Sequence, residues 1–280
     1  MILSFFLIIS GIVTEEFWSV RQAEVLSNRI YLKEQAYVQA ISAFESYLKF
    51  FKQDGTSVDT LNDIWAYPLE IPLPEGKIII SVEDEERFIN LNIVKNREGE
   101  KIVRRLFDLL KIKSFSVDDL KVWICGGFWD REEKPKKAIL DSPEELLYLG
   151  MSEKDFYGKV ENWEFYPGVK EMTTVWSNGK VNINTAPLQV IMALSPDIDK
   201  GLAESLIEYR EEHPFRKPED ILMVEGFTFE IWHEIKKWIT VKSENFKIHI
   251  SVKVGGVEGD LIVVINRRAG HFKIRYWRFS

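Results

Sequence analysis

The sequence predicts an α+β fold with one long N-terminal helix, a small antiparallel sheet and a large helical domain inserted into that sheet. Three observations predict it. No glycine or proline interrupts residues 12–53. A single β-branched run precedes a mainly helical block, and apolar and polar side chains alternate in the last forty residues. The length of 280 residues favours two domains, or one domain with a large insertion.

The N-terminal segment is predicted to be one continuous helix. Residues 1–13 are apolar apart from Ser4, Ser10 and Gly11, a run shorter than the ~20 residues that cross a bilayer. At ~1.5 Å per residue, a helix of about fifty residues is about 75 Å long, so we expect half of it to lie outside the globule. Its apolar end then belongs in lipid or in a bundle of similar helices. The apolar stripe at spacings of three and four consists of Leu26, Ile30, Tyr37, Ile41, Phe44, Leu48 and Phe51.

The strands are predicted on both sides of the helical block. Residues 77–82 (KIIISV) form one strand before it, and three strands follow it in an antiparallel meander. This order indicates one sheet that an inserted domain interrupts. We therefore expect an N-terminal membrane and assembly helix over 1–53, the first part of a β domain over 54–94, an inserted α-helical domain over 95–240, and C-terminal strands that complete the sheet over 241–280.

A short motif occurs twice, each time before a helical pattern. It reads Asn90-Leu91-Asn92 in the first copy and Asn182-Ile183-Asn184 in the second, which continues as Thr185-Ala186-Pro187. Asn side chains can cap exposed helix N–H groups, and proline suits a first helical turn. We expect a structural role for Asn90, Asn92, Asn182, Asn184, Thr185 and Pro187.

The charge balance argues against a polyanion-binding protein, and the motifs that are missing argue against an enzyme. Lys and Arg number 37 against 44 Asp and Glu, which gives a net charge of −7. No phosphate-binding glycine loop or Gly-x-Ser-x-Gly elbow occurs, and none of the four histidines pairs at i, i+4. We expect no catalytic site and no required cofactor. The single cysteine, Cys125, excludes an intrachain disulfide, and we expect it to be a small core residue.

One acidic segment has two interpretations. Asp130, Glu132 and Glu133 supply oxygen ligands of the kind that Ca²⁺ prefers, but Ca²⁺ takes about six to eight of them and this segment offers three at most. A solvated charged loop is the alternative to a calcium site.

Residues 186–239 contain two pairs of short helices that resemble tandem helix–hairpin–helix proteins of DNA uptake. In the first hairpin, Asp197 and Asp199 occupy positions where glycines would approach a phosphate, and in the second Glu225 precedes Gly226. Carboxylates there repel a polyanion. We expect a helix–hairpin–helix or SAM-like scaffold without a nucleic-acid partner.

Taken in order, these features resemble the minor pseudopilin K family of the bacterial type II secretion system (general secretion pathway protein K). The shared features are the apolar N-terminal helix, the strand at 76–82, Asp84-Glu85 followed by Asn90-Leu91-Asn92, the Trp123 to Asp130 segment, the helix at 142–146, the motif at 181–187, Phe215 and the closing strands.

The resemblance implies a pilin-like fold and a role at the tip of a short periplasmic pseudopilus, in protein export across the outer membrane. It implies as partners the minor pseudopilins I and J and other pseudopilins, the inner membrane, and secreted substrates or the outer-membrane secretin. The expected location is the bacterial inner membrane, with a single pass and a periplasmic C-terminal domain. Some members bind calcium, and Asp130 best matches that region.

Pseudopilins begin with a short basic leader, whereas this chain opens inside its apolar stretch. We therefore expect upstream residues that complete the spanning segment. Two alternatives to the pseudopilin interpretation stay open: a membrane-tethered helix–hairpin–helix DNA-binding protein and a minor type IV pilin.

Overall fold

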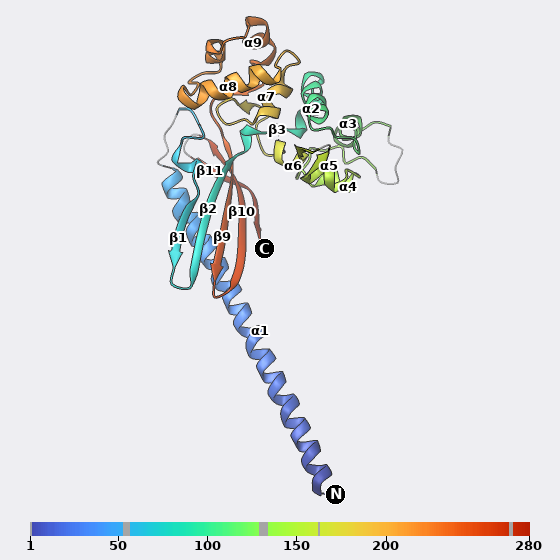
Figure 1. Ribbon diagram of the computed structural model, residues 1–280, viewed down its shortest axis with the longest axis vertical. Helices are drawn as coiled ribbons and strands as arrows, with labels where there is room; N and C mark the ends of the chain where they lie inside the picture. Colours follow the sequence, from blue (N-terminus) through green and yellow to red (C-terminus); the bar gives the residue numbers. More distant parts are fainter. Residues whose placement is uncertain (1, 53–56, 129–133, 162, 269–270) are drawn as a thin grey trace.

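The computed structural model describes residues 2–52, 57–128, 134–161, 163–268 and 271–280. The molecule is elongated: helix α1 (Ile2–Phe51) projects from the globule, and the sheet lies along the C-terminal part of this helix. The helical domain lies at the end opposite the N-terminus (Figure 1). The predicted α+β fold, with a long helix on an antiparallel sheet, is confirmed.

Helix α1 runs for 50 residues without a break, as predicted. Its N-terminal part is exposed, since Phe17 and Leu26 have 60% of their surface accessible. Full burial begins at Ala36 and Ala40, which face the sheet. The expectation that about half of the helix lies outside the globule is therefore confirmed.

The main sheet has the strand order β1-β2-β9-β10-β11, and every neighbouring pair is antiparallel. Its strands are β1 (Leu69–Leu73), β2 (Gly76–Asp84), β9 (Asn245–Val254), β10 (Val257–Arg268) and β11 (His271–Phe279). Strand β1 was not predicted, so two strands rather than one precede the helical block. It contains Pro72, which lacks an N–H group and is tolerated because β1 is an edge strand.

Helix α1 packs on the sheet through small residues and aromatic rings. The rings of Phe51 and Phe246 meet edge to face with centroids 4.9 Å apart, and those of Phe44 and Trp277 lie 5.3 Å apart. Such aromatic pairs add to the stabilisation from buried apolar area, by about 0.5–1.5 kcal/mol each. This core fixes the helix along β9, β10 and β11.

The inserted domain between β2 and β9 has a separate apolar core. Helix η1 (Ile64–Ala66) precedes β1 and lies outside it. The helices of the insertion are η2 (Glu85–Arg87), η3 (Leu91–Lys95), α2 (Arg97–Leu109), α3 (Val117–Cys125), α4 (Glu145–Tyr148), α5 (Glu153–Tyr157), α6 (Val169–Met172), α7 (Leu188–Leu194), α8 (Lys200–Glu212), η4 (Pro218–Met223) and α9 (Phe229–Ile235).

Three short strand pairs accompany these helices. They are β3 (Ile89–Asn90) with β6 (Thr173–Thr174), β4 (Gly158–Glu161) with β5 (Glu164–Pro167), and β7 (Val181–Asn182) with β8 (Ile239–Thr240). The β3–β6 and β7–β8 pairs are parallel. Strand β3 ends at Asn90 and strand β7 ends at Asn182, so each parallel pair contains the first residue of one Asn motif at the end of a strand.

The prediction that Cys125 is a core residue is wrong, because this residue is exposed. It is the last residue of α3, whose buried face contains Leu120, Trp123 and Ile124. A residue directly after Ile124 is rotated about 100° away from that face in a helix of 3.6 residues per turn.

Candidate functional site

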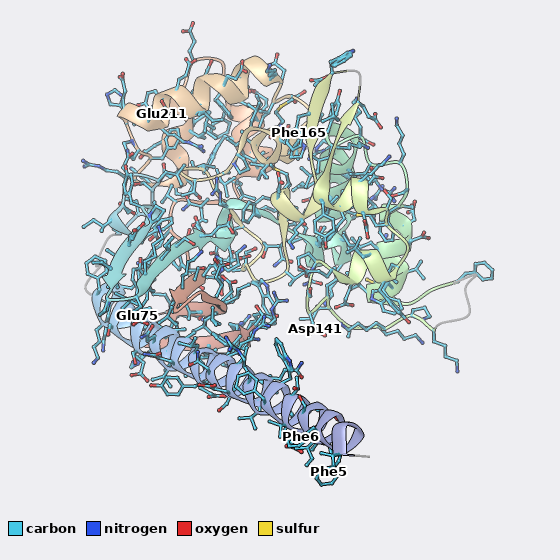
Figure 2. The ribbon with its side chains drawn as sticks, turned by 60° about the horizontal axis from the view of Figure 1, so that its bottom comes forward. Phe5, Phe6, Glu75, Asp141, Phe165 and Glu211 are labelled. Carbon is cyan, nitrogen blue, oxygen red and sulfur yellow. The ribbon has the colours of Figure 1, made fainter. Side chains whose placement is uncertain are left out.

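The exposed part of α1 carries large apolar side chains that no other described part of the chain covers. Phe5 and Phe6 are 64% and 66% exposed, and Figure 2 shows both on the part of the helix that extends beyond the globule. Phe17 and Trp18 are similarly exposed. Exposed apolar surface of this extent marks a protein-association or membrane-interaction site. Among the described residues, no helix contains an apolar stretch long enough to span a bilayer.

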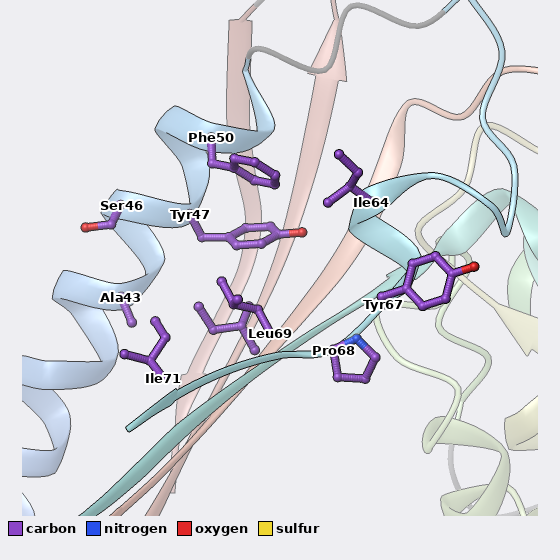
Figure 3. A pocket seen from close by; sticks show the side chains of 10 residues that line it. Ala43, Ser46, Tyr47, Phe50, Ile64, Tyr67, Pro68, Leu69 and Ile71 are labelled. Atoms are coloured by element: carbon purple, nitrogen blue, oxygen red, sulfur yellow. The ribbon is translucent and has the colours of Figure 1, made fainter. Parts of the chain in front are cut away.

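An apolar groove of about 430 Å³ lies where α1 ends beside the edge strand β1 (Figure 3). The rings of Tyr47 and Phe50 point from the helix toward Ile64, and Leu69 of the strand lies below the ring of Tyr47 in this view. The lining residues are Ala43, Ser46, Tyr47, Phe50, Ile64, Tyr67, Pro68, Leu69, Ile71 and Ile80. The groove is therefore a second apolar surface, on the part of α1 that packs against the globule.

The first Asn motif joins β3 to a distant loop. Asn90 accepts a hydrogen bond from the backbone N–H of Asn92 at 2.9 Å and donates to the carbonyl of Ser177 at 2.7 Å. The carboxamide of Asn92 pairs with both backbone groups of Leu140: the N–H at 2.8 Å and the carbonyl at 3.3 Å. Asn90 thus caps η3, while Asn92 holds the segment that contains Leu140.

The second motif repeats this geometry. Asn182 accepts from the N–H of Asn184 at 3.0 Å, and the carboxamide of Asn184 pairs with the N–H and the carbonyl of Phe215, both at 2.9 Å. In each copy an Asn side chain takes the place of a neighbouring strand by satisfying both backbone groups of one residue. Pro187 occupies the N-cap position of α7, directly before its first helical residue.

The second motif also meets a buried polar network at the junction of the two domains. Thr185 donates to the Asp84 carboxylate at 2.6 Å, and the amide nitrogen of Asn182 lies 3.2 Å from the same oxygen. That nitrogen is also 2.9 Å from the hydroxyl of Ser243 and 3.0 Å from the carbonyl of Asp59. Asp84 itself ends strand β2 of the main sheet.

Glu86 links the other side of the junction. Its carboxylate accepts from the N–H and the side-chain amide of Asn245, at 2.9 and 2.7 Å, and from the N–H groups of Glu244 and Asn178. Asp59 binds the Ser243 N–H at 2.8 Å. Residues from β2, β9 and the insertion therefore share one set of buried hydrogen bonds.

Burial sets the protonation of this network. It raises the pKa of Asp84 to about 6, while hydrogen bonds from Thr185 and Ser243 act in the opposite direction. It raises the pKa of Glu86 to about 8, and the neighbouring Asp84 carboxylate adds to that rise. The sequence analysis did not identify Asp84 and Glu86 as members of one buried polar network. The available signal was four consecutive acidic residues, Glu83 to Glu86, at the end of a β-branched strand.

The acidic residues proposed as calcium ligands, Asp130, Glu132 and Glu133, lie outside the described residues. Within the described ranges, no three His, Cys, Asp or Glu side chains are grouped as a metal site requires.

The helix–hairpin–helix elements are formed by α7 with α8 and by η4 with α9. Asp199 caps α8 by accepting the N–H of Leu202 at 2.8 Å. The helix terminus that would face a phosphate therefore already binds a carboxylate of the chain itself. In the second hairpin, Gly226 has a φ of +93° and packs so closely on Leu202 that a Cβ would lie 3.0 Å from its side chain. Gly226 therefore lets the second hairpin approach α8 closely.

Comparison with known proteins agrees with this architecture. Residues 181–228, which contain the second Asn motif and the first hairpin, match the family described as type II secretion system, protein K. No curated protein matches the chain. A chain of the solved GspK–GspI–GspJ complex from enterotoxigenic Escherichia coli is similar in fold, with a TM-score of 0.65 and 16% identity. The similarity covers 93% of this chain and 99% of that one. The family match at 181–228 and the shared fold together confirm the resemblance to protein K of the type II secretion system.

Proposed function

We propose that the chain is a minor pseudopilin that helps to assemble the pseudopilus of a type II secretion system. The observation that carries the proposal is the exposed apolar part of α1, which the chain's own globule leaves uncovered. Apolar area contributes about 25 cal/mol per Å² when it is removed from water, so this surface favours association with other helices or with lipid.

The partners that we propose are this system's counterparts of GspI and GspJ. The solved complex that resembles this chain contains these three proteins together. Two surfaces of this chain suit such partners: the exposed side chains of α1 and the apolar groove between α1 and β1. Both surfaces lie along α1, so we propose that neighbouring subunits use one or both of them.

The shape supports a position at the tip. The helical domain widens the molecule at the end away from the N-terminus (Figure 1). In a filament whose subunits align their N-terminal helices, such a domain obstructs the subunit that would follow it, so only the last position accommodates it. There it would face secreted substrates or the outer-membrane secretin. We place the apolar end of α1 in the inner membrane and the globule in the periplasm, and we propose no catalytic role.

The test is co-purification of the full chain with its candidate I and J partners. Phe17→Glu should weaken complex formation at least tenfold, because it removes an apolar contact and adds a charge. Gln22→Glu is the matched control, since Gln22 is also exposed on α1 and the variant adds the same charge without removing apolar surface. Equal recovery of the two variants would show that this face of α1 is not the interface.

The DNA-binding alternative has a separate test. Salt-dependent binding to duplex DNA at micromolar protein would support it. Failure to bind at low salt would remove it.

A further inference from the structure

A pocket of about 420 Å³ lies between α2, the end of α7 and α9, and neither α1 nor the junction residues Asp84, Glu86 and Asn182 line it. Its volume falls in the range of small-molecule sites, about 300–1,000 Å³. Four cationic side chains and two carboxylates line it: Lys101, Arg105, Lys236, Lys237, Glu98 and Glu234. The chain as a whole is acidic, with a net charge of −7, so this excess of two positive charges is local.

Arg105 is held in place by backbone groups rather than by a carboxylate. Its Nε and Nη2 atoms donate to the carbonyls of Ala193 and Leu194 at 2.8 and 2.7 Å, at the end of α7. Burial lowers the pKa of its guanidinium from the ordinary value. Within the described ranges, Nη1 has no hydrogen-bond acceptor and no carboxylate lies within ion-pair distance. Arg105 is therefore a fixed cation with one N–H face left for a ligand.

Both carboxylates of the pocket already have partners. Glu98 forms an ion pair with Lys237, whose ammonium also lies 5.3 Å from the centre of the Trp238 ring. Glu234 accepts a hydrogen bond from the hydroxyl of Ser195. Lys101 and Lys236 are exposed and form no ion pair in the described part of the chain. A hydroxyl does not neutralise a carboxylate, so Glu234 offsets one of the three remaining cations, Lys101, Arg105 and Lys236, and the excess of the pocket is two positive charges.

We propose that this pocket binds a small phosphate monoester. A guanidinium fork matches phosphate oxygens in geometry, and a phosphate monoester carries about −1.5 to −2 charges at pH 7, which balances the local excess. Buried Ile102 and Leu194 and the ring of Trp238 line the same pocket and provide apolar contact for the organic part of the ligand. This inference does not depend on the assignment of the chain to the pseudopilus.

The ligand could be a soluble monoester or a lipid headgroup, and the two sources are separated by the probe. Calorimetric titration of the full chain with glycerol 3-phosphate tests the soluble source. Titration with monomeric dihexanoyl phosphatidic acid, against dihexanoyl phosphatidylcholine, tests the lipid source. Saturable binding of either phosphate monoester supports the site, and the tighter probe identifies the source.

Variants locate the binding. Arg105→Gln should weaken it about ten- to hundredfold, the loss expected for one charge-assisted hydrogen bond. Because that variant also removes contacts to α7, the double variant Lys101→Gln/Lys236→Gln provides a second test that alters only exposed side chains. Lys154→Gln, an exposed lysine on α5, is the control and should bind as the unaltered chain does.

Two results would overturn the proposal. One is the absence of saturable binding by both monoesters at millimolar concentration. The other is binding that the pocket variants leave unchanged, or that Lys154→Gln weakens as much as they do.

Discussion

Replacing Asn184 by alanine tests whether the repeated Asn motif holds the inserted domain together. Asn184 is 3% exposed and Phe215 is 1% exposed, so the variant leaves the N–H and the carbonyl of Phe215 buried without a partner. Each such group costs about 1–3 kcal/mol, which gives an expected loss of about 2–6 kcal/mol in the free energy of unfolding.

The chain contains its own comparison for this experiment. Asn92 forms the same pair of hydrogen bonds with Leu140, but its side chain is only partly buried. Water can replace part of the lost bonding there, so Asn92→Ala should cost about 1–2 kcal/mol. Asn184→Asp should cost at least as much as Asn184→Ala, because it places a carboxylate oxygen against the Phe215 carbonyl.

Urea unfolding of the full chain and amide hydrogen exchange at residue 215 provide the two measurements. Amide exchange at Phe215 should accelerate strongly in Asn184→Ala and little in Asn92→Ala. This difference would show that the loss of stability comes from the hydrogen bond between the Phe215 N–H and Asn184. An Asn184→Ala variant that loses less than about 1 kcal/mol, or less than Asn92→Ala, would refute the reasoning.

Three further predictions follow from the junction, the sheet and the acidic loop. The pKa values of Asp84 and Glu86 are raised to about 6 and about 8, so the folded state holds these protons more tightly than the unfolded chain does. Stability should therefore fall as the pH rises from about 5 to about 8, and a melting temperature that climbs over this range would contradict the prediction. Gly76→Ala should cost more than about 2 kcal/mol, because a Cβ there would lie 1.8 Å from the carbonyl oxygen of Lys253. Gly11→Ala, with nothing within 4 Å, is its control in thermal melts. The calcium interpretation of the acidic loop predicts that Ca²⁺ raises the melting temperature and that Asp130→Ala abolishes the rise; no change in either protein would remove Asp130 as a ligand.

The elements that could be predicted from the sequence are those whose signals are local. Residues 12–53 lack glycine and proline, and the structure has one helix over Ile2–Phe51. Strict alternation from Phe246 to Val254 predicted a strand, and β9 contains it. Each of these patterns is set by one element and by the face that this element buries. Residues close to one another in the sequence are therefore sufficient to predict the element.

The junction could not be predicted because its partners are far apart in the sequence. Glu86 binds Asn245, 159 residues away, and Asn182 reaches Asp59, 123 residues away. A carboxylate after a strand is ordinary in a sequence, and only the fold shows which donors surround it. Strand β1 was missed for another reason: Pro72 weakens the strand signal, and only its place at the sheet edge makes the proline acceptable.

The buried polar junction has a consequence for assembly. Apolar surfaces of a sheet and a helical domain can slide past one another at small cost, whereas a set of hydrogen bonds is satisfied in one arrangement only. Asp84, Glu86 and Asn182 lie where the inserted domain meets the end of β2, and together their hydrogen bonds join segments of both domains. We infer that these residues fix the angle between the helical domain and α1. If α1 sets the position of the subunit in a filament, that angle then determines which surface of the helical domain faces outward. A junction variant such as Asn182→Ala should therefore impair assembly with partners more than its effect on the stability of α1 would explain.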